Sequence, residues 1–140
     1  MTPMKRRMLA VEACQARFLN KPYEPGKRDC LKLVKHALHT VGRRVGLTRG
    51  VRYSTEAGAV KALRKLGFRT LIEAVDASDL VRIAPAMALP GDVLALQSGE
   101  DGFGCALALF LGNGKAMTFV GGVCVQGALG DTPMAAWRLI

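Results

Sequence analysis

The sequence lacks the long apolar runs, aromatic clusters and export signals that mark several large protein classes. Aromatic residues make up 6% of its 140 residues, and only two histidines are present. No apolar run approaches the ~20 residues that a transmembrane helix needs. After the basic residues 5–7, the apolar stretch ends at Glu12, which is too short for a secretion signal. We therefore expect no membrane span, no signal peptide, and assembly in a cytoplasm.

Closely spaced metal-binding cysteines are also missing. The four cysteines, Cys14, Cys30, Cys105 and Cys124, lie far apart and form no CxxC pair. A zinc or iron–sulfur site would require the fold to bring all four together. Free cysteines are among the most frequently buried residue types. The spacing therefore favours a packing role for at least three of them, and predicts no metal and no cofactor.

What the sequence does contain is an uneven distribution of charge. Hydrophobic residues make up 50% of the chain, and its formal net charge is +9. Residues 1–90 hold 18 Lys and Arg against 7 Asp and Glu, whereas residues 91–140 hold 2 against 4 and contain 10 of the 16 glycines. A chain of this length can bury roughly two-thirds of its unfolded surface. We expect one domain over residues 1–140, with a helical half at about 4–85 and a β-sheet half at about 90–140.

Apolar spacings of three and four residues predict helices in the first half. Asp29 is the expected N-cap of the second helix and Gly42 its stop, and either Ser54 or Thr55 caps the third. Residues 78–83 are ambiguous between a helical turn and a strand. The expected helices cover residues 4–19, residues 30–41 and a segment ending near Gly67.

Beyond Pro90 and Gly91 the hydrophobic pattern becomes that of strands. Asn113-Gly114 stands between two apolar runs, which predicts a β-hairpin. Helices followed by a meander of strands predict an α+β domain with an antiparallel sheet. The expected strands are 92–96, 105–111, 115–120, 123–125 and 137–140.

Cys30 is the candidate nucleophile. It begins the second predicted helix directly after Lys27, Arg28 and the N-cap, and both the helix dipole and these cations favour a thiolate. The pattern thus predicts a lowered thiol pKa, with the sulfur reachable behind a loop rich in Pro and Gly. Spacing alone leaves open that Cys30 is simply the first core residue of an amphipathic helix.

Neither histidine can activate Cys30 from within the same helix. His36 and His39 lie roughly 9 and 13 Å further along the helix axis, which a rigid helix does not bridge. We expect both on the helix surface or in its last turn, where an imidazolium suits the dipole.

Three motifs in order resemble the NlpC/P60 cysteine peptidases. The stretch from Tyr23 to Cys30, with Gly26 and Asp29, is similar to the Asp-Cys start of their catalytic helix. Pro-Gly-Asp at 90–92 is similar to the opening of their first core strand, and residues 106–114 to their histidine-bearing hairpin. Small NlpC/P60-like proteins encoded among phage tail genes also share the terminal Ala-Trp-Arg, here residues 136–138. The resemblance implies a papain-like α+β fold.

The same resemblance implies a degenerate catalytic site. The family's general-base histidine falls on Ala106, and the third member of its triad falls near Thr118, while the nucleophile position is kept as Cys30. Loss of an activating partner costs several orders of magnitude in rate. Cys105 beside the missing histidine cannot replace it as a base.

Two functions follow from the resemblance. The first is a structural component of a phage or prophage tail tip, carried in the virion, with other tail-tip proteins as partners and peptidoglycan or an acidic envelope surface as further candidates. The alternative is an active cysteine peptidase that cleaves peptidoglycan peptide crosslinks during DNA entry, with its base supplied from elsewhere.

Nucleic-acid binding is a third class of function, which the positive charge of residues 1–90 suggests. The basic residues include a loop with Arg43, Arg44, Arg49 and Arg52, but aromatic residues are not interleaved with them. We expect no nucleic-acid partner. The charge is more typical of a face that docks on an acidic protein or an anionic envelope.

Overall fold

The computed structural model describes residues 1–47, 52–98 and 103–140 and has an α+β architecture, as the sequence predicted. Arg49 of the expected basic loop lies outside the described residues. The helices are α1 (Pro3–Phe18), α2 (Cys30–Thr40), α3 (Glu56–Lys65), α4 (Leu71–Asp76) and the short 3-10 helix η1 (Pro85–Met87). The strands are β1 (Arg82–Ile83), β2 (Val93–Leu96), β3 (Ala106–Gly112), β4 (Lys115–Val120), β5 (Val123–Ala128) and β6 (Ala135–Trp137).

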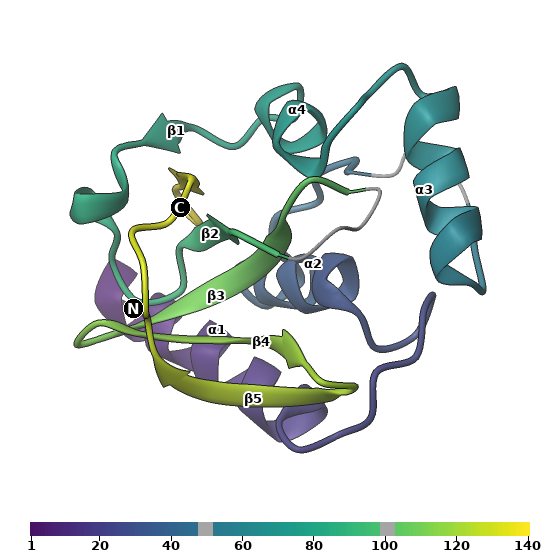
Figure 1. Ribbon diagram of the computed structural model, residues 1–140. Helices are drawn as coiled ribbons and strands as arrows, with labels where there is room; N and C mark the ends of the chain where they lie inside the picture. Colours follow the sequence, from purple (N-terminus) through teal and green to yellow (C-terminus); the bar gives the residue numbers. More distant parts are fainter. Residues whose placement is uncertain (48–51, 99–102) are drawn as a thin grey trace.

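The strands form one antiparallel sheet of six, in the order β1-β6-β2-β3-β4-β5. In Figure 1, α1 and α2 lie together on one side of this sheet, while α3 stands apart at the edge of the molecule. Alternate strand residues face the helices, so that Leu107 and Leu109 join the main core with Leu33 of α2. Leu94 and Ala108, on the opposite face, belong to a smaller apolar cluster. The sheet therefore fixes the position of α2, whose first residue is Cys30.

Caps decide where the helices begin and end. The Asp29 carboxylate accepts a hydrogen bond from the Lys32 N–H at 2.9 Å, which confirms it as the N-cap of α2. Gly42 ends that helix with a φ of 78°, in the left-handed region that favours glycine. Thr55, rather than Ser54, caps α3.

Helix α4 was not predicted. Thr70 accepts a hydrogen bond from the Glu73 N–H, and the Glu73 carboxylate accepts one from the Arg69 N–H at 2.6 Å. This arrangement resembles a capping box, whose Thr-x-x-Glu signature is visible in the sequence. The hydrophobic pattern does not predict this helix, because its 6 residues are too few to display a helical period.

The predicted strands are largely present, with two corrections. Asn113 and Gly114 have φ values of 52° and 68°, which is the conformation of a type I′ turn and confirms the hairpin. The last strand covers Ala135–Trp137 and not residues 137–140, because the side chain and backbone of Arg138 turn to other partners. The ambiguous segment 78–83 ends in strand β1, so the sheet draws one strand from the half expected to be helical.

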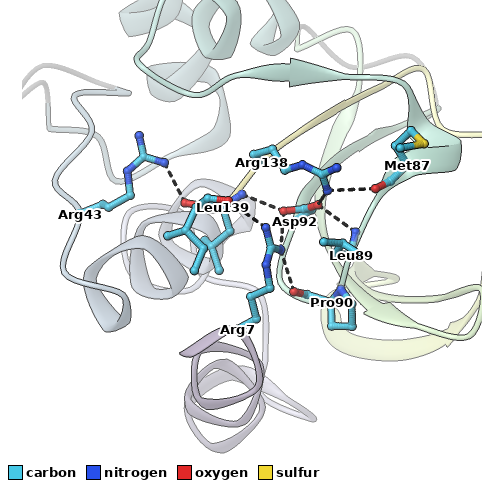
Figure 2. Close-up of polar contacts among 9 residues, drawn as sticks. Arg7, Arg43, Met87, Leu89, Pro90, Asp92, Arg138 and Leu139 are labelled. Atoms are coloured by element: carbon cyan, nitrogen blue, oxygen red, sulfur yellow. Dashed lines mark hydrogen bonds and ion pairs between the residues drawn. The ribbon is translucent and has the colours of Figure 1, made fainter. Parts of the chain in front are cut away.

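A buried ionic network joins distant parts of the chain around Asp92 (Figure 2). Its carboxylate binds the guanidinium of Arg7 at 2.6 Å and that of Arg138 at 2.7 Å. It also accepts hydrogen bonds from the backbone N–H groups of Leu89 and Leu139, both at 2.8 Å. Asp92 is fully buried and Arg7 is 3% exposed, so the pair is shielded from water.

The network fastens α1 to both ends of the sheet half. Arg7 additionally donates to the carbonyl oxygens of Pro90 and Ile140, each at 3.0 Å. Arg43, just after α2, donates to the Leu139 carbonyl oxygen at 2.8 Å, as Figure 2 also shows. Two of the sequence motifs, Pro-Gly-Asp and Ala-Trp-Arg, therefore meet in space and have a structural role.

Candidate functional site

The three positions singled out from the sequence line a single open groove. Cys30 comes from the start of α2, Ala106 from the start of β3 and Thr118 from β4. The groove has a volume of about 220 Å³. It is completed by Tyr23, Glu56, Ser98, Phe103, Cys105, Phe119 and Gly122. The fold thus brings together residues that are 76 and 12 positions apart in the sequence.

The loop before Cys30 is held by Asp29. Besides capping α2, its buried carboxylate accepts hydrogen bonds from the Gly26 N–H at 2.8 Å and from the Tyr53 hydroxyl at 2.7 Å. Burial, followed by the charge of Asp29 and this hydrogen bond, holds the pKa of Tyr53 well above its usual range. Tyr53 therefore remains a hydrogen-bond donor. Sequence reasoning missed it because the contact spans 24 residues and has no local signature.

Gly26 is required by the geometry of this loop. Its φ is 86°, and a β-carbon at this position would collide with the Tyr53 carbonyl oxygen. The glycine of the Gly-x-x-Asp-Cys motif therefore permits the loop to approach Tyr53 closely. It has no chemical part in the site.

We expect Gly26→Ala to lower the free energy of unfolding by at least about 1 kcal/mol more than Gly42→Ala does. Both substitutions place alanine at a positive φ, which costs about 1–2 kcal/mol. Only Gly26 adds a steric clash, because nothing lies within 4 Å of a β-carbon at Gly42. Urea unfolding of the two variants measures the difference, and equal losses would show that the close approach to Tyr53 is unimportant.

The predicted lowering of the Cys30 pKa is wrong. The pKa of Cys30 is raised to about 12, chiefly by burial of the thiol; a backbone hydrogen bond from Leu107 opposes this rise, and the charges of Asp29 and Cys105 contribute to it. A helix dipole contributes only about 0.3–1 kcal/mol, less than one pKa unit, so burial outweighs it. Cys30 at the groove wall is therefore a neutral thiol at physiological pH.

The two cations expected to assist the thiolate are directed elsewhere. Lys27 and Arg28 both pair with Glu24, at 3.6 and 2.9 Å. Arg28 also donates to the Pro22 carbonyl oxygen at 3.1 Å. Their proximity to Cys30 in the sequence is thus not an electrostatic pairing in the fold.

The other two triad positions offer no base. Ala106 presents only a methyl group, and the Thr118 hydroxyl donates to the Leu107 carbonyl oxygen at 2.8 Å. The backbone of Leu107 therefore contacts both Thr118 and Cys30, since it also makes the hydrogen bond to the Cys30 thiol. Of the described residues that line the groove, none is a histidine, and Glu56 alone carries a carboxylate.

Both histidines lie on α2 away from the groove, as expected. His39 is exposed in the last turn of the helix. His36 is half-buried, with its ring edge-on to Phe18 and with Arg17 at 3.1 Å from its Nδ1 atom. Burial, then the charges of Arg17 and His39, lowers the pKa of His36.

The described part of the chain also bears on metal binding and on membrane insertion. There, no three His, Cys, Asp or Glu side chains are grouped closely enough to hold a metal ion. Across the same residues, no helix has the length and apolarity needed to cross a bilayer.

Comparisons with known proteins agree with this fold. A family described as a domain of unknown function (DUF6950) matches residues 4–139. The search of curated proteins finds no match to this sequence.

Three solved structures share the fold at low sequence identity. One, from Staphylococcus aureus subsp. aureus Mu50, is described as similar to a lipoprotein of the NLP/P60 family; it has a TM-score of 0.66 and 15% identity over 99% of this chain and 43% of its own. The NlpC/P60 domain of the peptidoglycan hydrolase SagA has a TM-score of 0.59 and 19% sequence identity, over 94% of this chain and 97% of its own. The peptidoglycan hydrolase RipB from Mycobacterium tuberculosis has a TM-score of 0.60 and 17% sequence identity, over 97% of this chain and 65% of its own. The chain thus spans less than two-thirds of the first and third, and the NlpC/P60-like fold predicted from its motifs is confirmed.

Proposed function

Because the chain belongs to the family described as a domain of unknown function (DUF6950) and has the fold of NlpC/P60 domains, we propose that it is a non-catalytic member of this fold that serves as a structural component of a bacteriophage or prophage tail tip. It would act in the virion, in contact with other tail-tip proteins. Peptidoglycan or an acidic envelope surface is a further partner in this proposal.

The state of the Cys30 groove carries the non-catalytic part of the proposal. A cysteine nucleophile needs a thiolate and a base within hydrogen-bond reach. Here the pKa of Cys30 is raised to about 12, and Ala106, where the resemblance places the family's histidine, lines the same groove. Among the described residues of the groove, Glu56 carries the one carboxylate, and it is exposed.

The tail-tip part of the proposal is supported by the resemblance to small proteins encoded among phage tail genes. Ala136-Trp137-Arg138, the motif shared with those proteins, is built into the core of this chain. The Trp137 indole donates to Asp76 at 2.9 Å, and Arg138 binds Asp92. A motif that stabilises the fold, together with a groove whose thiol is protonated, fits a protein with a structural role.

Hydrolysis of peptidoglycan stem peptides tests the proposal. We expect the purified chain and its Cys30→Ala variant to give the same background rate, because the thiol is protonated and no histidine lies among the described residues of its groove. The NlpC/P60 domain of SagA, run in parallel, verifies that the substrate can be cleaved. Mass spectrometry of the released peptides measures the rate.

Activity that disappears in Cys30→Ala would contradict the proposal. It would favour the alternative, a cysteine peptidase that cleaves peptide crosslinks during DNA entry with a base supplied from elsewhere. Ala106→His supplies a second check, since it places an imidazole on the groove beside Cys30. If activity appears in this variant alone, the missing base is sufficient to explain the inactivity.

A further inference from the structure

Basic side chains converge on a second hollow, separate from the Cys30 groove. It lies where the end of α1, the loop before α2 and the first turn of α2 meet. It is open and has a volume of about 380 Å³. Its lining consists of Arg17, Gly26, Lys27, Arg28 and Lys32, so that every side chain on its wall carries a positive charge.

The charge of this basic hollow is only partly neutralised by the protein. Glu24 pairs with Lys27 and Arg28. Across residues 1–47, 52–98 and 103–140, neither Arg17 nor Lys32 forms an ion pair. The described wall of the hollow therefore has four cations; the Glu24 carboxylate pairs with two of them, and the buried Asp29 carboxylate is hydrogen-bonded to the backbone of Gly26 and Lys32.

The basic surface continues along α2. Lys32, Lys35, His36 and His39 follow one another at helical spacing and so share one face of the helix. Burial and then the charge of Lys32 lower the pKa of Lys35, against a smaller opposite effect of Asp29, and burial and then the charges of Arg17 and His39 lower the pKa of His36. These neighbours therefore repel one another, which is the condition that a bound anion relieves.

We propose that the basic hollow binds a phosphate-bearing polymer that carries no nucleobases. Arginine guanidinium groups match phosphate oxygens with paired hydrogen bonds, and lysines add point charges around them. Arg17, which forms no ion pair among the described residues, supplies the first kind of contact, and Lys27 and Lys32 the second. Arg28, held by Glu24 and the Pro22 carbonyl oxygen, adds its charge. The open shape suits one segment of a longer chain.

The residues that line the hollow favour this ligand over two other partners, an acidic protein and a single-stranded nucleic acid. A protein interface needs buried aromatic or apolar anchors at its centre, and none of the described residues that line this hollow has an apolar side chain. Single-stranded nucleic acid needs aromatic platforms for base stacking, which are equally missing from its described lining. Attraction to repeated phosphates requires neither. The proposal is independent of whether Cys30 is catalytic.

Calorimetric titration with linear polyphosphate tests the inference. We expect affinity to fall steeply with salt, and Arg17→Gln/Lys32→Gln to weaken binding about tenfold or more and to reduce the salt slope by about two. Lys61→Gln/Lys65→Gln removes the same charge from two exposed positions of α3 and should leave the affinity within about twofold. Lys27→Gln, whose side chain is 76% exposed, should give a smaller loss and guards against a folding defect.

Several results would overturn the inference. Equal losses in the two double variants would mean that only net charge matters. Tighter binding of oligo(dT) or of poly-glutamate than of polyphosphate, at equal charge, would identify a nucleic acid or an acidic protein as the partner instead. Orthophosphate is expected to bind much more weakly than the polymer, and an NMR shift of the His36 ring on adding polyphosphate is expected to locate the site.

Discussion

Asp92→Ala is expected to lower the free energy of unfolding by about 3–5 kcal/mol, because it leaves a buried guanidinium without its carboxylate. Arg7 is 3% exposed and cannot regain water in the folded state. The substitution also removes the acceptor for the N–H groups of Leu89 and Leu139. Denaturant unfolding followed by circular dichroism measures the loss.

Two comparisons separate the buried ion pair from charge in general. Asp131→Asn removes a carboxylate from an exposed position and should change stability by less than about 0.5 kcal/mol. Arg7→Met combined with Asp92→Asn should cost less than the sum of the two single substitutions, by about 0.5–3 kcal/mol, because the unpaired charge is gone. A loss below about 1 kcal/mol in Asp92→Ala would show that water reaches Arg7.

The local elements could be predicted from the sequence because their causes are local. Asp29 caps the helix that begins at the next residue by accepting a hydrogen bond from the N–H of Lys32, and Asn113-Gly114 forms a turn between its immediate neighbours. The order of the motifs also predicted the fold, and the structure gives the physical reason. Asp92 and Arg138, from two different motifs, bind each other.

Long-range contacts could not be predicted in the same way. Arg7 stands in a run of basic residues that resembles a solvated end of the chain, yet it is buried against a residue 85 positions later. Tyr53 reaches Asp29 across a loop, and nothing near it in the sequence indicates this. The basic hollow likewise depends on Arg17 of α1 lying beside the loop before α2.

The predicted lowering of the Cys30 pKa was wrong because it, too, depends on long-range contacts. The dipole and the two preceding cations are local features, whereas the burial that raises the pKa comes from packing α2 against β3. The sequence also hides that Lys27 and Arg28 are engaged by Glu24. Cys30, Ala106 and Thr118 line one groove, and the pKa of Cys30 there is set by the surrounding core.

Cys30 is consequently expected to react very slowly with alkylating agents in the folded protein. Only the thiolate reacts, and a pKa raised from 9.0 to about 12 reduces its fraction at neutral pH about a thousandfold. Cys14, with a pKa also raised to about 12 by burial, should be similarly inert. Ala57→Cys supplies an exposed reference thiol on α3 in the same molecule.

Site-resolved labelling of Cys30 with iodoacetamide as a function of pH tests the central claim most directly. The account predicts a rate far below that of the reference thiol at pH 7, rising about tenfold per pH unit up to pH 10 without a plateau. Urea should abolish the difference between the two thiols. A rate that matches or exceeds the reference at pH 7, with a plateau at or below pH 8, would mean that Cys30 is an activated nucleophile and would contradict the account.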